Sequence, residues 1–230
     1  MFADKASHDL YNRLKNYTRK VPKLLRADEV TSWSVGNTYF DRNIFELTDI
    51  EVYVDCGSNH GHTIREFIEA VNGTYTHIYA YEPQKDLYEK LCKTFLKTHN
   101  ILISNVVIGE RNGRASIHKK PIYKEKIDTQ FCCNPDGDYE MKSLDKLLLK
   151  RGTYAPTFIK FDIEGMEREA IIGATKLLQT YKPKLAIACY HRRDDIDKIP
   201  ELLKKIQPEY SLYLRHYHKE NPHSTILYAV

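Results

Sequence analysis

Acidic side chains close several short apolar runs in this chain, and glycine turns follow them. The first such acid, Asp55, ends the run 52–54 and precedes a turn that contains Gly57, Ser58, Asn59 and Gly61. An amphipathic run, 63–71, comes next. Glycine lets a backbone approach a ligand closely, and the first turn of a helix presents unpaired amides. The sequence therefore predicts that the turn 55–61 binds a nucleotide-like ligand.

The residue types on this turn indicate which ligand it holds. A dinucleotide turn has the pattern GxGxxG, whose middle glycine admits a pyrophosphate, but Asn59 occupies that position here. Asp55 also carries the wrong charge for a phosphate site, whereas it suits the sulfonium and amino group of S-adenosyl-L-methionine. We predict S-adenosyl-L-methionine as the cofactor, and an NAD(P)-dependent oxidoreductase is the alternative.

The end of the next predicted strand, 77–81, supports a nucleoside ligand. Glu82 follows Gly57 by 25 residues, near the spacing at which an acid binds ribose hydroxyls. A carboxylate accepts hydrogen bonds from both hydroxyls at once. Glu82 and the adjacent Pro83 are therefore predicted cofactor contacts, and Asn105, near the end of the third strand, is predicted to reach the adenine edge.

A second motif lies at 158–174, FIKFDIEGMEREAIIGA, and here the chain resembles the FkbM family of S-adenosylmethionine-dependent methyltransferases. The family pattern IKxDxEGxE followed by GA is matched by Ile159, Lys160, Asp162, Glu164, Gly165, Glu167, Gly173 and Ala174. The resemblance extends from about residue 53 to residue 230 through VDCGSNHGHT, YAYEP, PKLAIACYH and LYLRHY. The chain departs from the family pattern at Met166, Arg168 and Ile172, on the helix expected after Glu164.

The resemblance implies a class I methyltransferase (Rossmann-like) fold with a seven-stranded sheet and a reversed last strand. It also implies transfer of a methyl group to a hydroxyl of a sugar, a glycan or a related small metabolite. A hydroxyl loses its proton as it attacks a methyl group, and a positioned base adds about 10² to 10⁴-fold to such a reaction.

Three residues at later strand ends are the candidate catalytic group. His191 has the intrinsic pKa of a base near neutral pH, and Glu164 is the other candidate to accept the proton or bind the acceptor; the choice stays open here. Asp162 is predicted to position the cofactor as well. His60 and His62 resemble metal ligands, but no acid completes a metal-binding spacing with them, so we predict no essential metal. Arg215, His216 and His218 suggest, from their charge alone, an anionic acceptor.

The elements that must position these residues alternate between strand and helix from residue 51 onward. The alternation predicts a doubly wound, mostly parallel α/β sheet whose ligands lie at the carboxyl ends of the strands. Predicted strands are 100–107, 157–161 and 184–189, with an antiparallel pair, 210–215 and 225–229, at the end. Predicted helices are 4–19, 84–96, 143–149, 166–180 and 194–206, and a β excursion fills 109–139. We expect an N-terminal extension, 1–45, on a binding domain, 46–230.

Composition excludes several classes of function. The formal net charge is +4 from 35 basic and 31 acidic residues without a like-charge block, so nothing indicates nucleic acid. No apolar run is long enough to span a membrane, and the five cysteines lack CxxC spacing, which favours reduced thiols in the cytoplasm. We expect a small-molecule or glycan acceptor with a free hydroxyl. A homodimer through the extension and a catalytically silent Rossmann-like binding protein both stay open.

Overall fold

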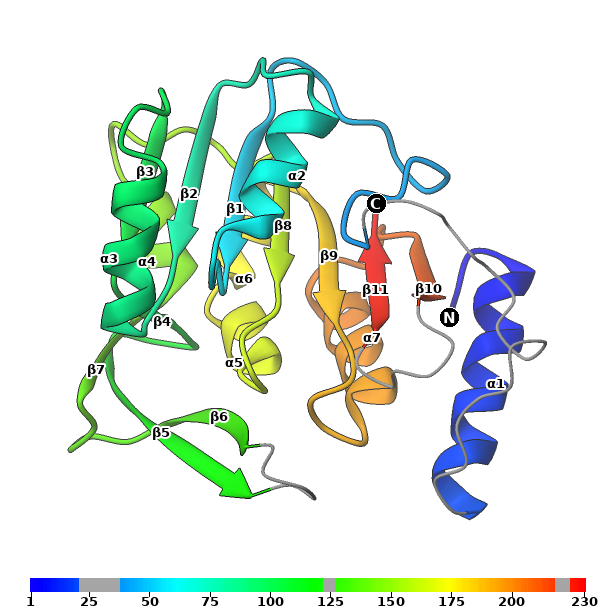
Figure 1. Ribbon diagram of the computed structural model, residues 1–230. Coiled ribbons are helices and arrows are strands. Elements are labelled where there is room, and N and C mark those ends of the chain that lie inside the picture. Colours follow the sequence, from blue (N-terminus) through cyan, green and yellow to red (C-terminus); the bar gives the residue numbers. More distant parts are fainter. Residues whose placement is uncertain (21–37, 122–126, 218–223) are drawn as a thin grey trace.

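The computed structural model of the chain describes residues 1–20, 38–121, 127–217 and 224–230. A seven-stranded sheet, in the order β10-β11-β9-β8-β1-β2-β3, forms the middle layer (Figure 1). Its strands are β1 (Val52–Cys56), β2 (His77–Tyr81), β3 (Ile101–Ser104), β8 (Phe158–Phe161), β9 (Lys184–Ala188), β10 (Leu212–His216) and β11 (Thr225–Ala229). β11 runs antiparallel to both of its neighbours, β9 and β10, and the other pairings of this sheet are parallel. The predicted doubly wound sheet with a reversed last strand is confirmed.

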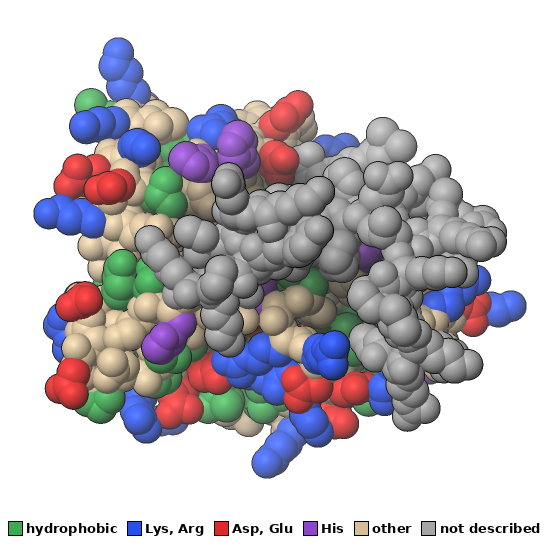
Figure 2. Space-filling model, turned by 60° about the horizontal axis from the view of Figure 1, so that its bottom comes forward, with side chains coloured by type: hydrophobic (Ala, Val, Ile, Leu, Met, Phe, Trp, Pro, Cys, Tyr) green, Lys and Arg blue, Asp and Glu red, His purple; other side chains and the backbone are tan. Residues whose placement is uncertain are grey.

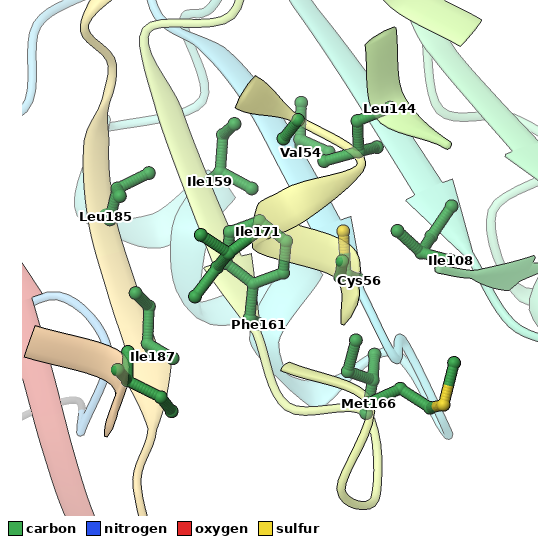
Figure 3. Packing of buried hydrophobic residues seen from close by; sticks show 14 of the residues in the cluster. Val54, Cys56, Ile108, Leu144, Ile159, Phe161, Met166, Ile171, Leu185 and Ile187 are labelled. Atoms are coloured by element: carbon green, nitrogen blue, oxygen red, sulfur yellow. The ribbon is translucent and has the colours of Figure 1, made fainter. Parts of the chain in front are cut away.

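Helices cover both faces of this sheet (Figure 1). α2 (His62–Ala70) and α3 (Lys85–Thr94) lie on one face. The other face is covered by α4 (Leu144–Leu148), α5 (Glu167–Ile172), α6 (Thr175–Tyr181) and α7 (Asp195–Ile206). Successive strand residues point to opposite faces, so Val54 packs in one core and Tyr53 in the other. Figure 3 shows the first core, in which Phe161 and Ile187 of the strands meet Ile171 of α5.

The predicted strand 100–107 is confirmed only over residues 101–104, because the chain leaves the main sheet after them. β3 ends at Ser104, and β4 (Val107–Ile108) belongs to a second, four-stranded sheet in the order β4-β7-β5-β6. β5 (Gly113–Pro121), β6 (Ile127–Cys133) and β7 (Tyr139–Lys142) complete this sheet. The β excursion is therefore confirmed, and its β5–β6 hairpin lies beyond the carboxyl ends of the main strands (Figure 1).

The predicted single helix 166–180 is interrupted at Gly173 and Ala174. A Cβ on Gly173 would lie 2.1 Å from the backbone oxygen of Gly109, so α5 ends where the chain passes against this loop. The carboxylate of Asp145 then accepts hydrogen bonds from the amides of Lys176 and Leu177 in the first turn of α6. The break thus places two short helices where the sequence pattern suggested one.

The N-terminal helix α1 (Lys5–Lys20) packs along the edge of the sheet beside β10 (Figure 1). The guanidinium of Arg215 forms an ion pair with Asp4, with 2.6 Å between Nη2 and Oδ2. It also donates to the hydroxyl of Ser7, which is fully buried. Residues 21–37 of the predicted extension lie outside the described residues. Among the described helices, none is long and apolar enough to cross a membrane.

Candidate functional site

A pocket lies at the carboxyl ends of β1, β2 and β8, where the strand-end residues converge. Its empty space, with the open solvent at its mouth included, is about 550 Å³. Its described lining consists of Gly57, Asn59, Tyr81, Glu82, Pro83, Gln84, Val106, Val107, Ile108, Phe131, Asp162, Ile163 and Glu164. Six predicted site residues are therefore brought together, and Phe131 of the β5–β6 hairpin joins them. Figure 2 shows this end of the molecule, where acidic and basic side chains intermingle on the surface.

The glycine turn after β1 lies tightly between two neighbouring strand ends. Gly57 has a φ of +84°, and a Cβ there would be 1.9 Å from the backbone oxygen of Asp162. Its amide and that of Ser58 both donate to the carbonyl of Tyr81. Gly61 serves a different purpose, because a Cβ there would meet the ring of Phe95 at 2.5 Å. Gly61 therefore lets α2 pack on α3, and Gly57 brings backbone to the pocket.

Asp55 does not face the pocket, so the charge argument built on it was wrong. Its carboxylate is fully buried, with Oδ1 at 3.1 Å from Nζ of Lys160 and Oδ2 accepting from the hydroxyl of Thr63 at 2.7 Å. Lys160 also donates to the carbonyl of Gly57 at 2.7 Å. Burial opposes the charge of Lys160, but the carboxylates of Asp55 and Asp162 outweigh it and raise the pKa of this ammonium. Asp55 thus holds Lys160, and Lys160 in turn binds the backbone of the turn at Gly57.

Glu82 lies in the pocket with both carboxylate oxygens already oriented. Oε2 accepts from the amide of Asn59 and Oε1 from the amide of Gln84, each at 2.8 Å. Burial raises the pKa of Glu82, although the two amides act in the opposite direction. Asn105 does not line the pocket; its amide donates to the carbonyls of Glu82 and Pro83 and borders an adjacent hollow. Asn105 therefore fixes the loop that carries Glu82.

Asp162 and Glu164 form the acidic side of the pocket. The hydroxyls of Tyr39 and Tyr190 donate to the two oxygens of Asp162 at 2.8 and 3.0 Å. Burial would raise the pKa of Asp162, but Lys160, His191 and these hydroxyls lower it. Glu164 has a φ of +55° and Gly165 one of +92°, so the chain reverses there and turns the Glu164 carboxylate toward the pocket. Tyr39, from the predicted extension, is a site residue that the sequence did not reveal.

His191 is placed next to these acids, although it does not line the pocket. Nε2 lies 3.6 Å from Oδ1 of Asp162 and 3.5 Å from Oε2 of Glu164, while Nδ1 is hydrogen-bonded to Oε1 of Glu167 at 2.9 Å. Burial favours the neutral ring, but Glu167 and the other two carboxylates outweigh it and raise the pKa of His191 to about 9. These carboxylates therefore favour the imidazolium over the neutral ring. The argument from its intrinsic pKa therefore fails.

Other predictions about histidines and cations change with the structure. One ligand-type atom from each of Asp162, Glu167 and His191 lies within 4.8 Å of the others. Among these three, the structure shows a hydrogen bond between His191 and Glu167, while Asp162 accepts from Tyr39 and Tyr190. The absence of an essential metal stays a prediction. Arg215 and His216 are buried and bonded to Asp4 and Thr225. They are unavailable to an anionic acceptor, and His218 lies outside the described residues.

Comparison with known proteins gives a family match and several similar folds. The family model described as Methyltransferase FkbM domain matches residues 55–210, and no curated protein matches the chain. The crystal structure of methyltransferase FkbM from Methylobacillus flagellatus has 24% identity and a TM-score of 0.78 and covers 100% of this chain. This chain spans about half of that protein, 56% of its length.

Two further structures share the fold at lower similarity. An rRNA methylase from Streptococcus thermophilus has 14% identity and a TM-score of 0.50, covering 80% of this chain and 87% of its own. Fibrillarin from Aeropyrum pernix, with natively bound S-adenosyl-L-methionine, has 12% identity and a TM-score of 0.52, covering 80% of this chain and 69% of its own. The family match includes the glycine turn, Glu82 and the 158–174 motif. The chain belongs to the FkbM methyltransferase family.

Proposed function

We propose that the protein is an S-adenosyl-L-methionine-dependent O-methyltransferase acting on a hydroxyl of a sugar, a glycan or a related small metabolite. The observation that carries this proposal is the charge of the pocket. Among its described lining residues, three are acids, namely Glu82, Asp162 and Glu164, and none is Lys, Arg or His. Such a lining suits a sulfonium and is unfavourable to the pyrophosphate of a dinucleotide.

The residues present fit the proposed cofactor. The buried carboxylate of Glu82 offers its remaining lone pairs to a ribose diol. The hydrogen bonds that it accepts from two backbone amides hold it in place. Pro83, Val106 and Val107 give an apolar surface for a purine, and Gly57 brings its backbone close to the methionine part. S-adenosyl-L-methionine, when bound, supplies an electrophilic methyl group on a sulfonium.

Glu164 is our candidate to take the proton of the acceptor hydroxyl. Its side chain lines the pocket and remains 43% exposed, so it has both a route to the acceptor and a route for the proton into solvent. In the overall reaction, an oxygen–carbon bond forms, the carbon–sulfur bond breaks, and its electron pair goes to sulfur. Holding the acceptor in line can supply about 7 to 11 kcal/mol.

Calorimetric titration with S-adenosyl-L-methionine and its demethylated product tests the cofactor. Glu82→Gln keeps one acceptor oxygen and loses one of the two charge-assisted hydrogen bonds to the diol, worth about 1.5 to 3 kcal/mol, so we expect binding to weaken by roughly 10- to 150-fold. Glu89→Gln, on the exposed side of α3, is the matched control and should bind as the wild type does. Equal binding by Glu82→Gln would remove Glu82 from the cofactor site.

Methyl transfer itself is tested with isotopically labelled S-adenosyl-L-methionine and a panel of neutral sugars, oligosaccharides and polyol metabolites. We expect label in an ether of one acceptor and loss of turnover in Glu164→Gln with cofactor binding retained. Binding of NAD(P) in place of S-adenosyl-L-methionine would favour the oxidoreductase alternative. Cofactor binding without label in any acceptor would favour a silent binding protein.

A further inference from the structure

Glu167 is a buried acid that the proposed chemistry does not yet use. It stands at the start of α5 with 1% of its side chain exposed. Its Oε1 accepts two hydrogen bonds, one from the amide of Ile163 and one with Nδ1 of His191, both at 2.9 Å. Its Oε2 is buried without a hydrogen-bond partner among the described residues. A carboxylate is costly to bury, so this position needs an explanation beyond packing.

The two bonds of Glu167 connect separate parts of the fold. Ile163 belongs to the turn after β8, and His191 belongs to the loop after β9. The turn reverses at Glu164 and Gly165, which returns the start of α5 toward the strand ends. Glu167 therefore ties the loop that presents Asp162 and Glu164 to the loop that presents His191.

We infer that Glu167 is a positioning residue, which holds His191 through Nδ1 so that Nε2 faces Asp162 and Glu164. This inference deepens the proposed function, on which its catalytic meaning rests. A hydrogen bond at one ring nitrogen determines what the other can do. Because the carboxylate of Glu167 accepts, Nδ1 carries a proton; in the imidazolium Nε2 carries one too and lies 3.6 and 3.5 Å from the two acids.

The groups around the ring of His191 determine which charge state of the ring is favoured. The groups that face the ring are Asp162 after β8, Glu164 in the following turn, Glu167 of α5 and the ring of Tyr190, at 4.4 Å between centroids. Three carboxylates around one imidazole favour the imidazolium. His191 then acts as a fixed cation beside Asp162 and Glu164, which favours the ionised form of Asp162 and limits the movement of both acids.

Nuclear magnetic resonance titration of the His191 ring tests this inference without any turnover. His191→Gln identifies the signal by its loss. In the wild type we expect a titration midpoint near 9. In Glu167→Gln, which keeps the shape and loses the charge, we expect the midpoint to fall by at least about one pH unit, a tenfold change in proton affinity. Glu169→Gln is the control. Glu169 lies on α5, as Glu167 does, but its carboxylate is bonded to Arg192, so this variant should leave the midpoint unchanged.

Two results would overturn the inference. One is an unchanged midpoint in Glu167→Gln when circular dichroism shows the native fold. The other is paramagnetic broadening of the His191 signal by micromolar Mn²⁺, since an ion on the ring would replace the bond to Glu167. In active enzyme, the pH profile of kcat/KM should shift in Glu167→Gln and not in Glu169→Gln. Failure of cofactor binding would defeat the proposed function and leave the titration result standing.

Discussion

Lys160 shows, at the scale of single residues, why charge on a sequence does not reveal charge in a site. Its ammonium is 2% exposed, paired with Asp55 and bonded to the carbonyl of Gly57. The sequence correctly marked Asp55 and Gly57 as one unit. It assigned the negative charge of Asp55 to a ligand, because the lysine that neutralises it lies 105 residues later on another strand.

Removing Lys160 should therefore damage the fold before it affects chemistry. Lys160→Met leaves the buried carboxylate of Asp55 without a counter-charge, and we expect a loss of about 3 to 5 kcal/mol in the free energy of unfolding, measured by urea titration. The double variant Asp55→Asn/Lys160→Met should recover part of it. The exposed ion pair between Lys198 and Glu201 offers a control, because Lys198→Met removes this pair and leaves no buried charge behind. A larger loss in the double variant than in Lys160→Met would contradict this account.

Gly57 and Gly73 provide a matched test of the turn. Both have positive φ, +84° and +79°, but only Gly57 faces backbone, whereas a Cβ on Gly73 meets nothing within 4 Å. Gly73→Ala should cost only the left-handed strain, about 1 to 2 kcal/mol. Gly57→Ala should lower the unfolding free energy further and abolish cofactor binding by calorimetry. Similar losses of unfolding free energy in the two variants would mean that the close approach of Gly57 to the backbone of Asp162 does not require glycine.

The helices and strands differ in how far sequence predicts them. Short apolar runs bounded by turn residues identified most strands of the main sheet and the terminal antiparallel pair, because both faces of strands such as β1, β8 and β11 are buried. The apolar pattern failed at residues 100–107 and 166–180, where it continues across a change of direction. Gly173 breaks the helix through contact with Gly109, a neighbour that no local pattern reveals. His191 was found from its strand end and Glu167 from the 158–174 motif, but the bond between them and the contact of Tyr39 with Asp162 required the folded chain.

The ion pair that holds α1 on β10 should make the stability of the protein depend on pH in acid. Burial alone would raise the pKa of Asp4, but Arg215 and Ser7 outweigh it and lower the pKa to about 2. A group whose pKa is lowered by folding stabilises above its unfolded pKa, near 3.8, and loses this effect as pH falls toward 2. We expect the wild type to be more stable than Asp4→Asn at pH 5 and the difference to vanish near pH 2, by urea unfolding. A difference independent of pH would show that the charge of Asp4 is not involved.

The whole molecule should respond to the cofactor as one unit. The pocket is built from β1, β2, β8 and the β5–β6 hairpin, so a ligand there contacts both sheets. At 100 times the dissociation constant, binding adds about 2.7 kcal/mol. For a chain of this length that raises Tm by about 5 to 10 °C, measurable by differential scanning fluorimetry. S-adenosyl-L-methionine should produce this shift and NAD should not; the reverse order would favour the oxidoreductase alternative.

The contact between α1 and β10 also determines the order in which the chain can fold during synthesis. Asp4 and Arg215 are 211 residues apart, so α1 is made well before the strand on which it packs. A free helix of 16 residues is only marginally stable in water. β11, which lies between β9 and β10, is later still. Because distant contacts slow folding, we expect the edge formed by β9, β11, β10 and α1 to close last, after the half that carries the pocket has formed.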